Sequence, residues 1–235
     1  MKIAIIPARG GSKRIPHKNI KPFCGRPIID YAIQTALDSN LFDEVIVSTD
    51  DPEIAKQALR SGAKVPFTRP LDLADDHTPT RSVIQHSLDY YENQGMNVDY
   101  ICCIYATSPF LSAEILRAAY SALEDAADKH ACFSATEFNY SPYRGFLYQG
   151  NGPELMFPEH QKSRSQDLKP VYHDAGQFYL YRTTHNKTIN PVINSANAII
   201  HTLPSYLVHD IDTPDDWTRA ELFYEAMKSH ENSRN

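Results

Sequence analysis

The sequence has few cysteines and no long apolar run, and each absence narrows the class of protein. Its 235 residues include four cysteines, at positions 24, 102, 103 and 132, and none forms a C-x-x-C pair. We therefore expect neither a zinc site nor a disulfide framework. Charge enters at Lys2 and no segment approaches ~18 uninterrupted apolar residues, so neither a signal peptide nor a membrane span is predicted. The composition favours a soluble, cytoplasmic protein with reduced thiols.

Two common nucleotide-binding patterns are also absent. The chain contains neither G-x-x-x-x-G-K-[ST] nor G-x-G-x-x-G. Its net charge of -6 disfavours a protein that tracks DNA or RNA, because such proteins present a basic surface to the phosphates. With 42% hydrophobic residues the chain can bury one substantial core, so we predict a single domain over residues 1–235.

Residues 3–19 contain the strongest signal that is present. Ile3 to Ile6 has the length and branching of a buried parallel strand, and Pro7 ends it before a glycine turn rich in cations, A-R-G-G-S-K-R. No acidic residue precedes Asp30, so positive charge is concentrated here. Adjacent glycines let backbone N–H groups face a ligand, and the cations can surround several oxygens. The stretch predicts a polyphosphate site, with a plain surface turn as the alternative.

Apolar runs and helical periods alternate along most of the chain. Buried strands are expected at 3–6, 44–49, 100–105, 131–136 and 198–203, with amphipathic helices at 27–37, 52–61, 83–91, 112–123 and 213–227. This alternation predicts an α/β fold: a doubly wound, mostly parallel sheet with helices on both faces, Rossmann-like in its layers. Asp51, Ser112 and Thr213 are expected to cap three of these helices.

A segment from about 138 to 191 breaks the alternation. It is rich in tyrosine, proline and glycine, and its best periodic stretch is 177–181. Aromatic segments of this kind build β-hairpins that leave an apolar face exposed, and such a face favours a protein partner. Arg144 and Arg164 lie in this segment, and a guanidinium can grip a carboxylate with two hydrogen bonds.

Two aspartates near the end of the chain suggest a metal site. If Ile211 continues a strand, Asp210 and Asp212 point the same way with ~7 Å between them. Magnesium prefers one or two carboxylates together with phosphate oxygens and water. Compensation of the following helix dipole is the alternative reading of the pair.

The run A-R-G-G-S-K-R-I-P-x-K-N resembles the signature of the CMP-sialic acid synthetase family, cytidylyltransferases that activate nine-carbon acidic sugars. H-K-N-I-K-P-F, I-C-C-I-Y-A-T-S-P-F and Y-H-D-A-G-Q-F-Y extend the likeness, which runs from Met1 to about Phe223. The resemblance implies a nucleotide-diphospho-sugar transferase-like fold, CTP and an acidic sugar as substrates, and Mg2+ as cofactor. It also implies a homodimer formed through the 138–191 segment, which reaches over the neighbouring subunit's site.

The resemblance also assigns roles to individual residues. It implies Arg9, Lys18 and Asp212 as catalytic residues, and Asp210 and Asp212 as metal ligands. The sugar-binding residues would be Tyr105, Thr107, Ser108, Arg144, Arg164 and Gln177. The CTP-binding residues would be Ala8, Arg9, Gly10, Gly11, Ser12, Lys13, Lys18, Asn19, Arg69 and Thr80. Without the resemblance, Arg69 would be expected to pair with an aspartate and Thr80 to help cap a helix.

The sequence departs from its sialic acid relatives at one pair of positions. Those enzymes typically carry glutamine and proline where this chain has Tyr105 and Ala106. Exchanging an amide for a phenol changes the hydrogen bonding of a sugar pocket, which favours pseudaminic acid, a sugar with a second acetamido group, over sialic acid. A purely structural Tyr105 is equally compatible with the sequence. Sialic acid, Kdo and a non-catalytic nucleotide-binding regulatory role remain as alternatives.

Overall fold

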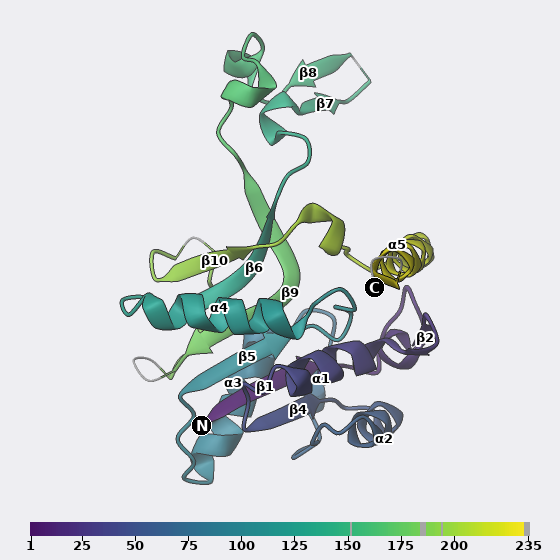
Figure 1. The fold of residues 1–235 in the computed structure, drawn as a ribbon, viewed down its shortest axis with the longest axis vertical. Coiled ribbons are helices and arrows are strands. Elements are labelled where there is room, and N and C mark those ends of the chain that lie inside the picture. The colour runs from purple at the N-terminus through teal and green to yellow at the C-terminus, as the bar shows by residue number, and fades with distance from the viewer. Residues whose placement is uncertain (151, 184–186, 194, 233–235) are drawn as a thin grey trace.

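A six-stranded sheet organises the molecule (Figure 1). The structure, a computed structural model, describes residues 1–150, 152–183, 187–193 and 195–232. The strand order is β10-β6-β9-β5-β1-β4. The bounds of these strands are Lys2–Pro7 for β1, Glu44–Ser48 for β4, Tyr100–Ile104 for β5, Ala131–Glu137 for β6, Tyr172–Arg182 for β9 and Ala198–Thr202 for β10.

The sheet is mostly parallel, as predicted. β1 pairs in parallel with β4 and β5, and β10 pairs in parallel with β6. β9 is the exception, because it runs antiparallel between β5 and β6. Its insertion places the aromatic stretch 177–181 in the middle of the sheet instead of in a peripheral hairpin.

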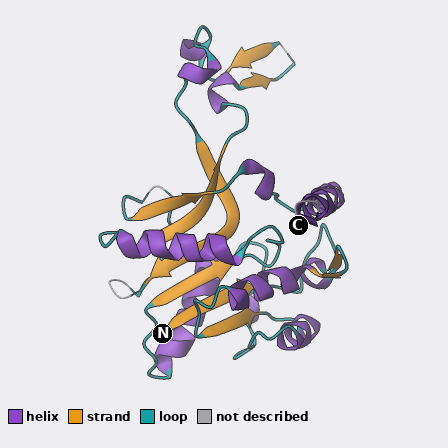
Figure 2. Ribbon diagram, viewed as in Figure 1, coloured by secondary structure: helices purple, strands orange, loops and turns teal. Residues whose placement is uncertain are grey.

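Helices cover both faces of the sheet (Figure 2). Since successive strand residues point to opposite faces, Ala4 and Ile6 pack with α1, α2 and α4, whereas Ile3 and Ile5 pack with α3. A third cluster joins α5 to the small β2–β3 hairpin. The helices span Ile28–Asp38 (α1), Pro52–Arg60 (α2), Thr80–Asn93 (α3), Ala113–Asp125 (α4) and Pro214–Asn232 (α5), and the hairpin strands span Pro22–Phe23 and Arg26–Pro27.

The three predicted caps are present. The Asp51 carboxylate accepts hydrogen bonds from the N–H groups of residues 53 and 54 at the start of α2. The Ser112 hydroxyl accepts from the Ile115 N–H, and the Thr213 hydroxyl accepts from the Asp216 N–H. Each satisfies a backbone donor that the first helical turn leaves without a partner. The α3 helix differs, because Thr80 is its first helical residue and the N-cap position is Pro79, which makes no side-chain capping hydrogen bond.

Residues 138–171 project from the sheet and carry a hairpin at their tip (Figure 1). Its strands are β7, Phe146–Tyr148, and β8, Pro153–Leu155. Phe146 and Tyr148 are 60% and 71% exposed. The predicted inserted segment, 138–191, also includes β9, which belongs to the central sheet, so the part that projects is shorter than predicted. Residues 151 and 184–186 of that segment lie outside the described residues.

Ile211 does not continue a strand, as the spacing argument for the two terminal aspartates assumed. A single 3-10 turn, Ser205–Leu207, follows Pro204, and residues 208–213 form an irregular connection. Ile211 is nevertheless buried, 2% exposed, in the cluster beneath α5, so Asp210 and Asp212 flank an anchored side chain. No helix in the described part of the chain is long and apolar enough to cross a membrane.

Candidate functional site

A cavity of about 570 Å³ opens where β1 and β5 end. Pro7 closes β1 and Tyr105 to Thr107 follow β5, so the cavity occupies the position expected for a ligand in an open α/β sheet. We call it the loop cavity. Its lining consists of Pro7, Arg9, Ser12, Lys13, Arg14, Ile15, Lys18, Asn19, Arg69, Leu73, Asp75, Asp76, Thr78, Thr80, Val83, Tyr105, Ala106, Thr107 and Asp212.

Hydrogen bonds to backbone groups of the glycine turn hold it against the ends of the strands. The Ala8 N–H donates to the Ser48 carbonyl at 2.9 Å, and the Gly10 N–H donates to the Asp50 carboxylate at 3.0 Å. The buried Asn19 amide donates to the Arg9 carbonyl at 3.0 Å and closes the loop on itself. These contacts direct the cations of the turn into the cavity.

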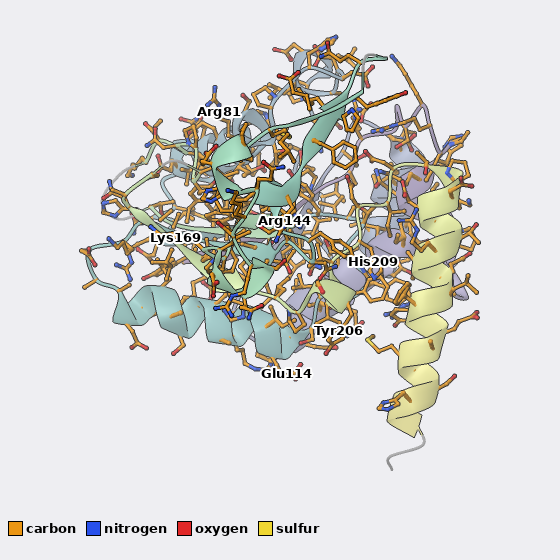
Figure 3. All side chains as sticks on the ribbon, turned by 90° about the horizontal axis from the view of Figure 1, so that it is seen from above. Arg81, Glu114, Arg144, Lys169, Tyr206 and His209 are labelled. Carbon is orange, nitrogen blue, oxygen red and sulfur yellow. The ribbon has the colours of Figure 1, made fainter. Side chains whose placement is uncertain are left out.

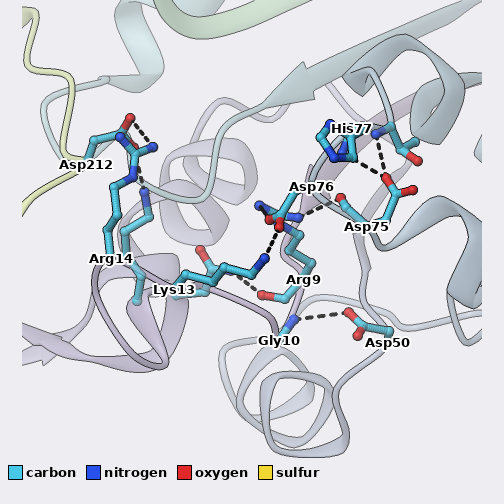
Figure 4. A network of polar contacts seen from close by, with 12 residues as sticks. Arg9, Gly10, Lys13, Arg14, Asp50, Asp75, Asp76, His77 and Asp212 are labelled. Atoms are coloured by element: carbon cyan, nitrogen blue, oxygen red, sulfur yellow. Dashed lines mark hydrogen bonds and ion pairs between the residues drawn. The ribbon is translucent and has the colours of Figure 1, made fainter.

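Two carboxylates each hold two cations of the turn (Figure 4). Asp76 contacts Arg9 at 2.7 Å and pairs closely with Lys13. Asp212 contacts Arg14 at 2.6 Å and Lys18 at 3.2 Å. The adjacent Lys13 and Arg9 lower the pKa of Asp76. Four cations converge on a cavity that holds acidic side chains, so an anionic ligand must displace these carboxylates to reach them.

Arg69 is the buried cation of the site. It is 4% exposed, and its guanidinium donates to the Ser48 hydroxyl at 3.1 Å and to the Ser48 carbonyl. Burial, with Arg9 nearby, lowers the pKa of Arg69 to about 10, so the group stays charged at neutral pH. It pairs with backbone and hydroxyl oxygens, and no ion pair to an aspartate is recorded for it among the described residues.

A second, largely apolar cavity of about 300 Å³ adjoins the first. We call it the apolar cavity. The two cavities share Thr80 and Tyr105, whose hydroxyl oxygens are 3.2 Å apart. The other described residues of its lining are Pro79, Arg81, Ile84, Tyr179, Tyr181, Pro191, Val192 and Ile193. A ligand with a charged half and a less polar half could span both.

Asp210 and Asp212 are electrostatically coupled. Partial burial raises the pKa of Asp210, and the nearby Asp212 charge raises it further. A cation bound beside the two carboxylates would offset the repulsion that acts on Asp210. Among the described residues no group of three or more His, Cys, Asp or Glu could hold a metal ion. A metal here would need ligand oxygens in addition to the protein's carboxylates.

Several predicted site residues lie off the loop cavity. Ser108 and Gln177 are buried behind it, and the Gln177 amide donates to the Leu207 carbonyl at 2.6 Å. Arg144 lies in the projecting segment, which Figure 3 views from above, and donates to the Ser163 carbonyl. Arg164 pairs with Asp167 in the same segment. Ala8, Gly10, Gly11 and Asp210 also do not line it.

Sequence reasoning missed the acidic loop that faces the glycine turn. The Asp75 carboxylate accepts from the N–H groups of residues 77 and 78, which shapes a tight turn, and its carbonyl accepts from Arg9 at 2.6 Å. Asp76 follows and meets the cations. Both lie more than sixty residues from their partners. The excess of basic residues near the start of the chain was the one available signal that acids from elsewhere would gather there.

Substitution of the two adjacent glycines should have unequal effects. A Cβ on Gly10 would lie 2.6 Å from the Asp51 carboxylate, whereas a Cβ on Gly11 meets no atom within 4 Å. We expect Gly10→Ala to lower the free energy of unfolding by about 1–3 kcal/mol because the cap of α2 must shift. Gly11→Ala, the matched control, should change it by less than about 0.5 kcal/mol. Urea unfolding of both variants measures this, and equal losses would contradict the close approach.

This fold and this cation-lined cavity at the strand ends define a nucleotidyltransferase. More specifically, the chain belongs to the cytidylyltransferase family, whose sequence model matches residues 3–209. It is 44% identical over 232 residues to a pseudaminic acid cytidylyltransferase of Campylobacter jejuni, covering 98% of each chain. It is 30% identical to a CMP-N,N'-diacetyllegionaminic acid synthase of Legionella pneumophila, covering 95% of this chain and 96% of the relative.

Solved structures share the fold. A CMP-2-keto-3-deoxy-manno-octonic acid synthetase complexed with CTP superposes with a TM-score of 0.66 at 17% identity, over 98% of this chain and 99% of the other. A 4-diphosphocytidyl-2C-methyl-D-erythritol synthase of Anaerococcus prevotii gives a TM-score of 0.62 at 15% identity, over 95% and 98%. The predicted α/β nucleotidyltransferase fold is thereby confirmed.

Proposed function

We propose that this protein transfers the cytidylyl group of CTP to pseudaminic acid, in the cytoplasm and with Mg2+, forming CMP-pseudaminic acid and pyrophosphate. The observation that carries the proposal is the 44% identity to a pseudaminic acid cytidylyltransferase over 98% of both chains. The convergence of four cations on the loop cavity supports a triphosphate as ligand.

In this proposal the loop cavity holds CTP. Arg9, Lys13 and Lys18 contact the phosphates after leaving Asp76 and Asp212. Arg69 and Thr80 contact the cytosine base. A guanidinium and a hydroxyl can donate to the O2 and N3 acceptors of cytosine. Ser12 and Asn19 complete the nucleotide contacts from the same loop.

The divalent cation would be held by Asp212 and Asp210, together with phosphate oxygens of CTP. Burial and the nearby Asp212 charge raise the pKa of Asp210, and a bound cation would offset this repulsion, which supports the assignment. When bound, Mg2+ would supply positive charge next to the phosphate group at which negative charge builds up. Arg14 and Lys18 already contact Asp212, so the chain's own cations hold the carboxylate beside the phosphates.

The reaction itself is a displacement at phosphorus. The anomeric hydroxyl oxygen of the sugar forms a bond to the α-phosphorus of CTP, and the bond from that phosphorus to the α,β-bridging oxygen breaks. Pyrophosphate takes the bonding electrons, and the hydroxyl proton passes to water. The protein's contribution is positioning and charge neutralisation, since no protein bond forms or breaks.

The sugar would lie in the apolar cavity, against Tyr105 and beside Thr107. This cavity adjoins the proposed CTP site through Thr80 and Tyr105, as an acceptor sugar requires. Acetamido and methyl groups suit a wall of tyrosine, valine and isoleucine. Ser108 and Gln177, buried behind Tyr105, would act by supporting this wall, since the Tyr105 N–H donates to the Gln177 carbonyl at 2.9 Å.

The test is initial-rate pyrophosphate release with CTP and Mg2+. Pseudaminic acid, N,N'-diacetyllegionaminic acid, N-acetylneuraminic acid and Kdo are offered in parallel. The proposal expects the highest kcat/KM with pseudaminic acid. A higher value with another sugar would overturn the substrate assignment and keep the reaction, whereas silence with all four, despite CTP binding, would favour a regulatory nucleotide-binding role.

We also propose a homodimer formed through the projecting hairpin. An isolated two-stranded hairpin is marginally stable in water, and β7–β8 exposes the apolar side chains of Phe146, Leu147 and Tyr148. A second copy would cover this surface and bring Arg144 and Arg164 to the carboxylate of the sugar in the neighbouring site.

Substitution of the hairpin surface should release monomers. We expect the double variant Phe146→Ser/Tyr148→Ser to halve the mass measured by light scattering, because both side chains would lose their apolar partner. Leu222→Ser on α5, 64% exposed in the native chain, is the matched control and should leave the mass unchanged. A wild-type protein that is monomeric at micromolar concentration would contradict the dimer.

A further inference from the structure

The β9 strand contains an irregularity beside the apolar cavity. Phe133 of β6 pairs with Tyr179, but Ala135, two residues further on, pairs with Asp174. Between these two pairs β9 advances five residues along the chain, whereas β6 advances two. In a regular strand, residues five apart point to opposite faces and lie ~17 Å apart. Here the bulge brings the two residues together, and the Tyr179 hydroxyl donates to the Asp174 carboxylate at 2.5 Å.

The bulge is held by specific hydrogen bonds. The fully buried Ser134 hydroxyl accepts from the N–H groups of Gln177 and Phe178, at 3.1 and 3.2 Å. Gly176 has a φ of +60°, a conformation that favours glycine, and its N–H donates to the second oxygen of Asp174 at 2.8 Å. Both carboxylate oxygens are therefore occupied, one by the backbone and one by the Tyr179 phenol.

Asp174 is a carboxylate that has no basic partner among the described residues. No ion pair is recorded for it in the described part of the chain, although it is half-buried. Its charge is held instead by the Gly176 N–H and the Tyr179 hydroxyl. Because hydrogen bonds to a charged acceptor are stronger than those to a neutral one, the Tyr179 hydroxyl proton stays in the hydrogen bond to Asp174.

Tyr179 in turn faces Tyr105. Their ring centroids are 5.5 Å apart, and both rings line the apolar cavity. A phenol has one proton, so a Tyr179 hydroxyl that donates to Asp174 presents only its lone pairs to other groups. On its other side the Tyr105 hydroxyl meets Thr80 at 3.2 Å. Burial raises the pKa of both phenols, so both stay protonated at neutral pH.

We propose that Asp174, acting through Tyr179, is the positioning residue that orients the Tyr105 hydroxyl and so sets which acidic sugar the apolar cavity accepts. The Tyr105 and Tyr179 side chains share a hydrogen bond. Because the Tyr179 proton is donated to Asp174, the Tyr179 oxygen accepts in this bond and the Tyr105 proton points toward it. The Tyr105 oxygen then presents its lone pairs to Thr80 and to a donor on the sugar, such as an acetamido N–H. This inference rests on the proposed function, since it concerns discrimination among its sugar substrates.

Two isosteric substitutions test this chain of contacts from Asp174 through Tyr179 to Tyr105, which we call the relay. Asp174→Asn removes the charge and keeps the shape, and Tyr179→Phe removes the hydroxyl. Each is expected to lower kcat/KM for pseudaminic acid about 10- to 100-fold, chiefly through KM for the sugar, with KM for CTP within about twofold. The preference for pseudaminic acid over N-acetylneuraminic acid should fall in parallel. Tyr172→Phe, an exposed tyrosine of the same strand, is the matched control and should change neither value.

A double variant separates the relay from independent structural effects. If Asp174 acts through Tyr179, Asp174→Asn/Tyr179→Phe should lose no more than the worse single variant, whereas independent residues would lose the product of the two effects. Unchanged sugar preference in both single variants, or multiplicative losses, would overturn the inference while leaving the proposed function in place. If wild-type protein releases pyrophosphate with none of the sugars, the proposed function and the role of Asp174 are both overturned. Should Asp174→Asn not fold, Tyr179→Phe alone carries the comparison of sugars.

Discussion

Replacing Asp212 by alanine is expected to lower kcat about a thousandfold while changing the dissociation constant for CTP by less than about threefold. The reason lies in the contacts of this carboxylate. In the free protein it holds Arg14 and Lys18, at 2.6 and 3.2 Å, and in the proposed complex it holds the divalent cation. Its loss frees two cations for the triphosphate, which offsets the loss of a metal ligand in binding but not in the displacement.

The two quantities are measured separately. Pyrophosphate release with Mg2+ gives kcat, and calorimetric titration of CTP in the presence of EDTA gives affinity without the metal. Asp215→Ala removes an acid three residues away that does not line the loop cavity, and it should leave both values unchanged. A kcat within tenfold of wild type in Asp212→Ala would remove Asp212 from the metal assignment.

Replacing Arg9 by alanine should lower kcat/KM for CTP by about 10² to 10³-fold. Arg9 has two partners in this region, the Asp75 carbonyl at 2.6 Å and the Asp76 carboxylate at 2.7 Å. A guanidinium matches two phosphate oxygens at once, so its loss removes directed hydrogen bonds as well as charge.

The acid that holds Arg9 gives the opposite prediction. Asp76→Asn removes the charge that competes with the triphosphate for Arg9 and Lys13, so KM for CTP should fall or stay level.

The control for Arg9→Ala is Arg60→Ala, which also removes one positive charge, at the exposed end of α2, and should behave as wild type. An Arg9→Ala protein with unaltered kcat/KM would show that the triphosphate lies elsewhere.

Elements with local signals were predictable from the sequence. A buried run such as 3–6 and caps such as Asp51 or Ser112 depend on a few neighbouring residues, and the structure confirms them. The glycine turn was recognisable for the same reason, because strand, turn and cations are contiguous. Its contacts with Asp76 were not, since no local pattern distinguishes that acid from the other aspartates of its loop.

The errors share a physical cause. The stretch 177–181 has the period of any half-buried strand, and its place between β5 and β6 depends on pairing partners far along the chain. The bulge depends on Ser134, which sequence reasoning had no reason to select. The metal hypothesis assumed that Ile211 continues a strand. Pro204 and the 3-10 turn after it instead interrupt the extended chain before Ile211 is buried under α5.

The most direct test of the whole account is phosphorus NMR of one reaction mixture containing the protein, CTP, Mg2+ and pseudaminic acid. The account predicts that the triphosphate signals give way to a phosphodiester signal and a pyrophosphate signal in equal amounts, and that omission of the sugar stops the change. Formation of CMP and pyrophosphate without the sugar would indicate hydrolysis, and an unchanged CTP spectrum would indicate no reaction. Either result would contradict the proposed cytidylyl transfer.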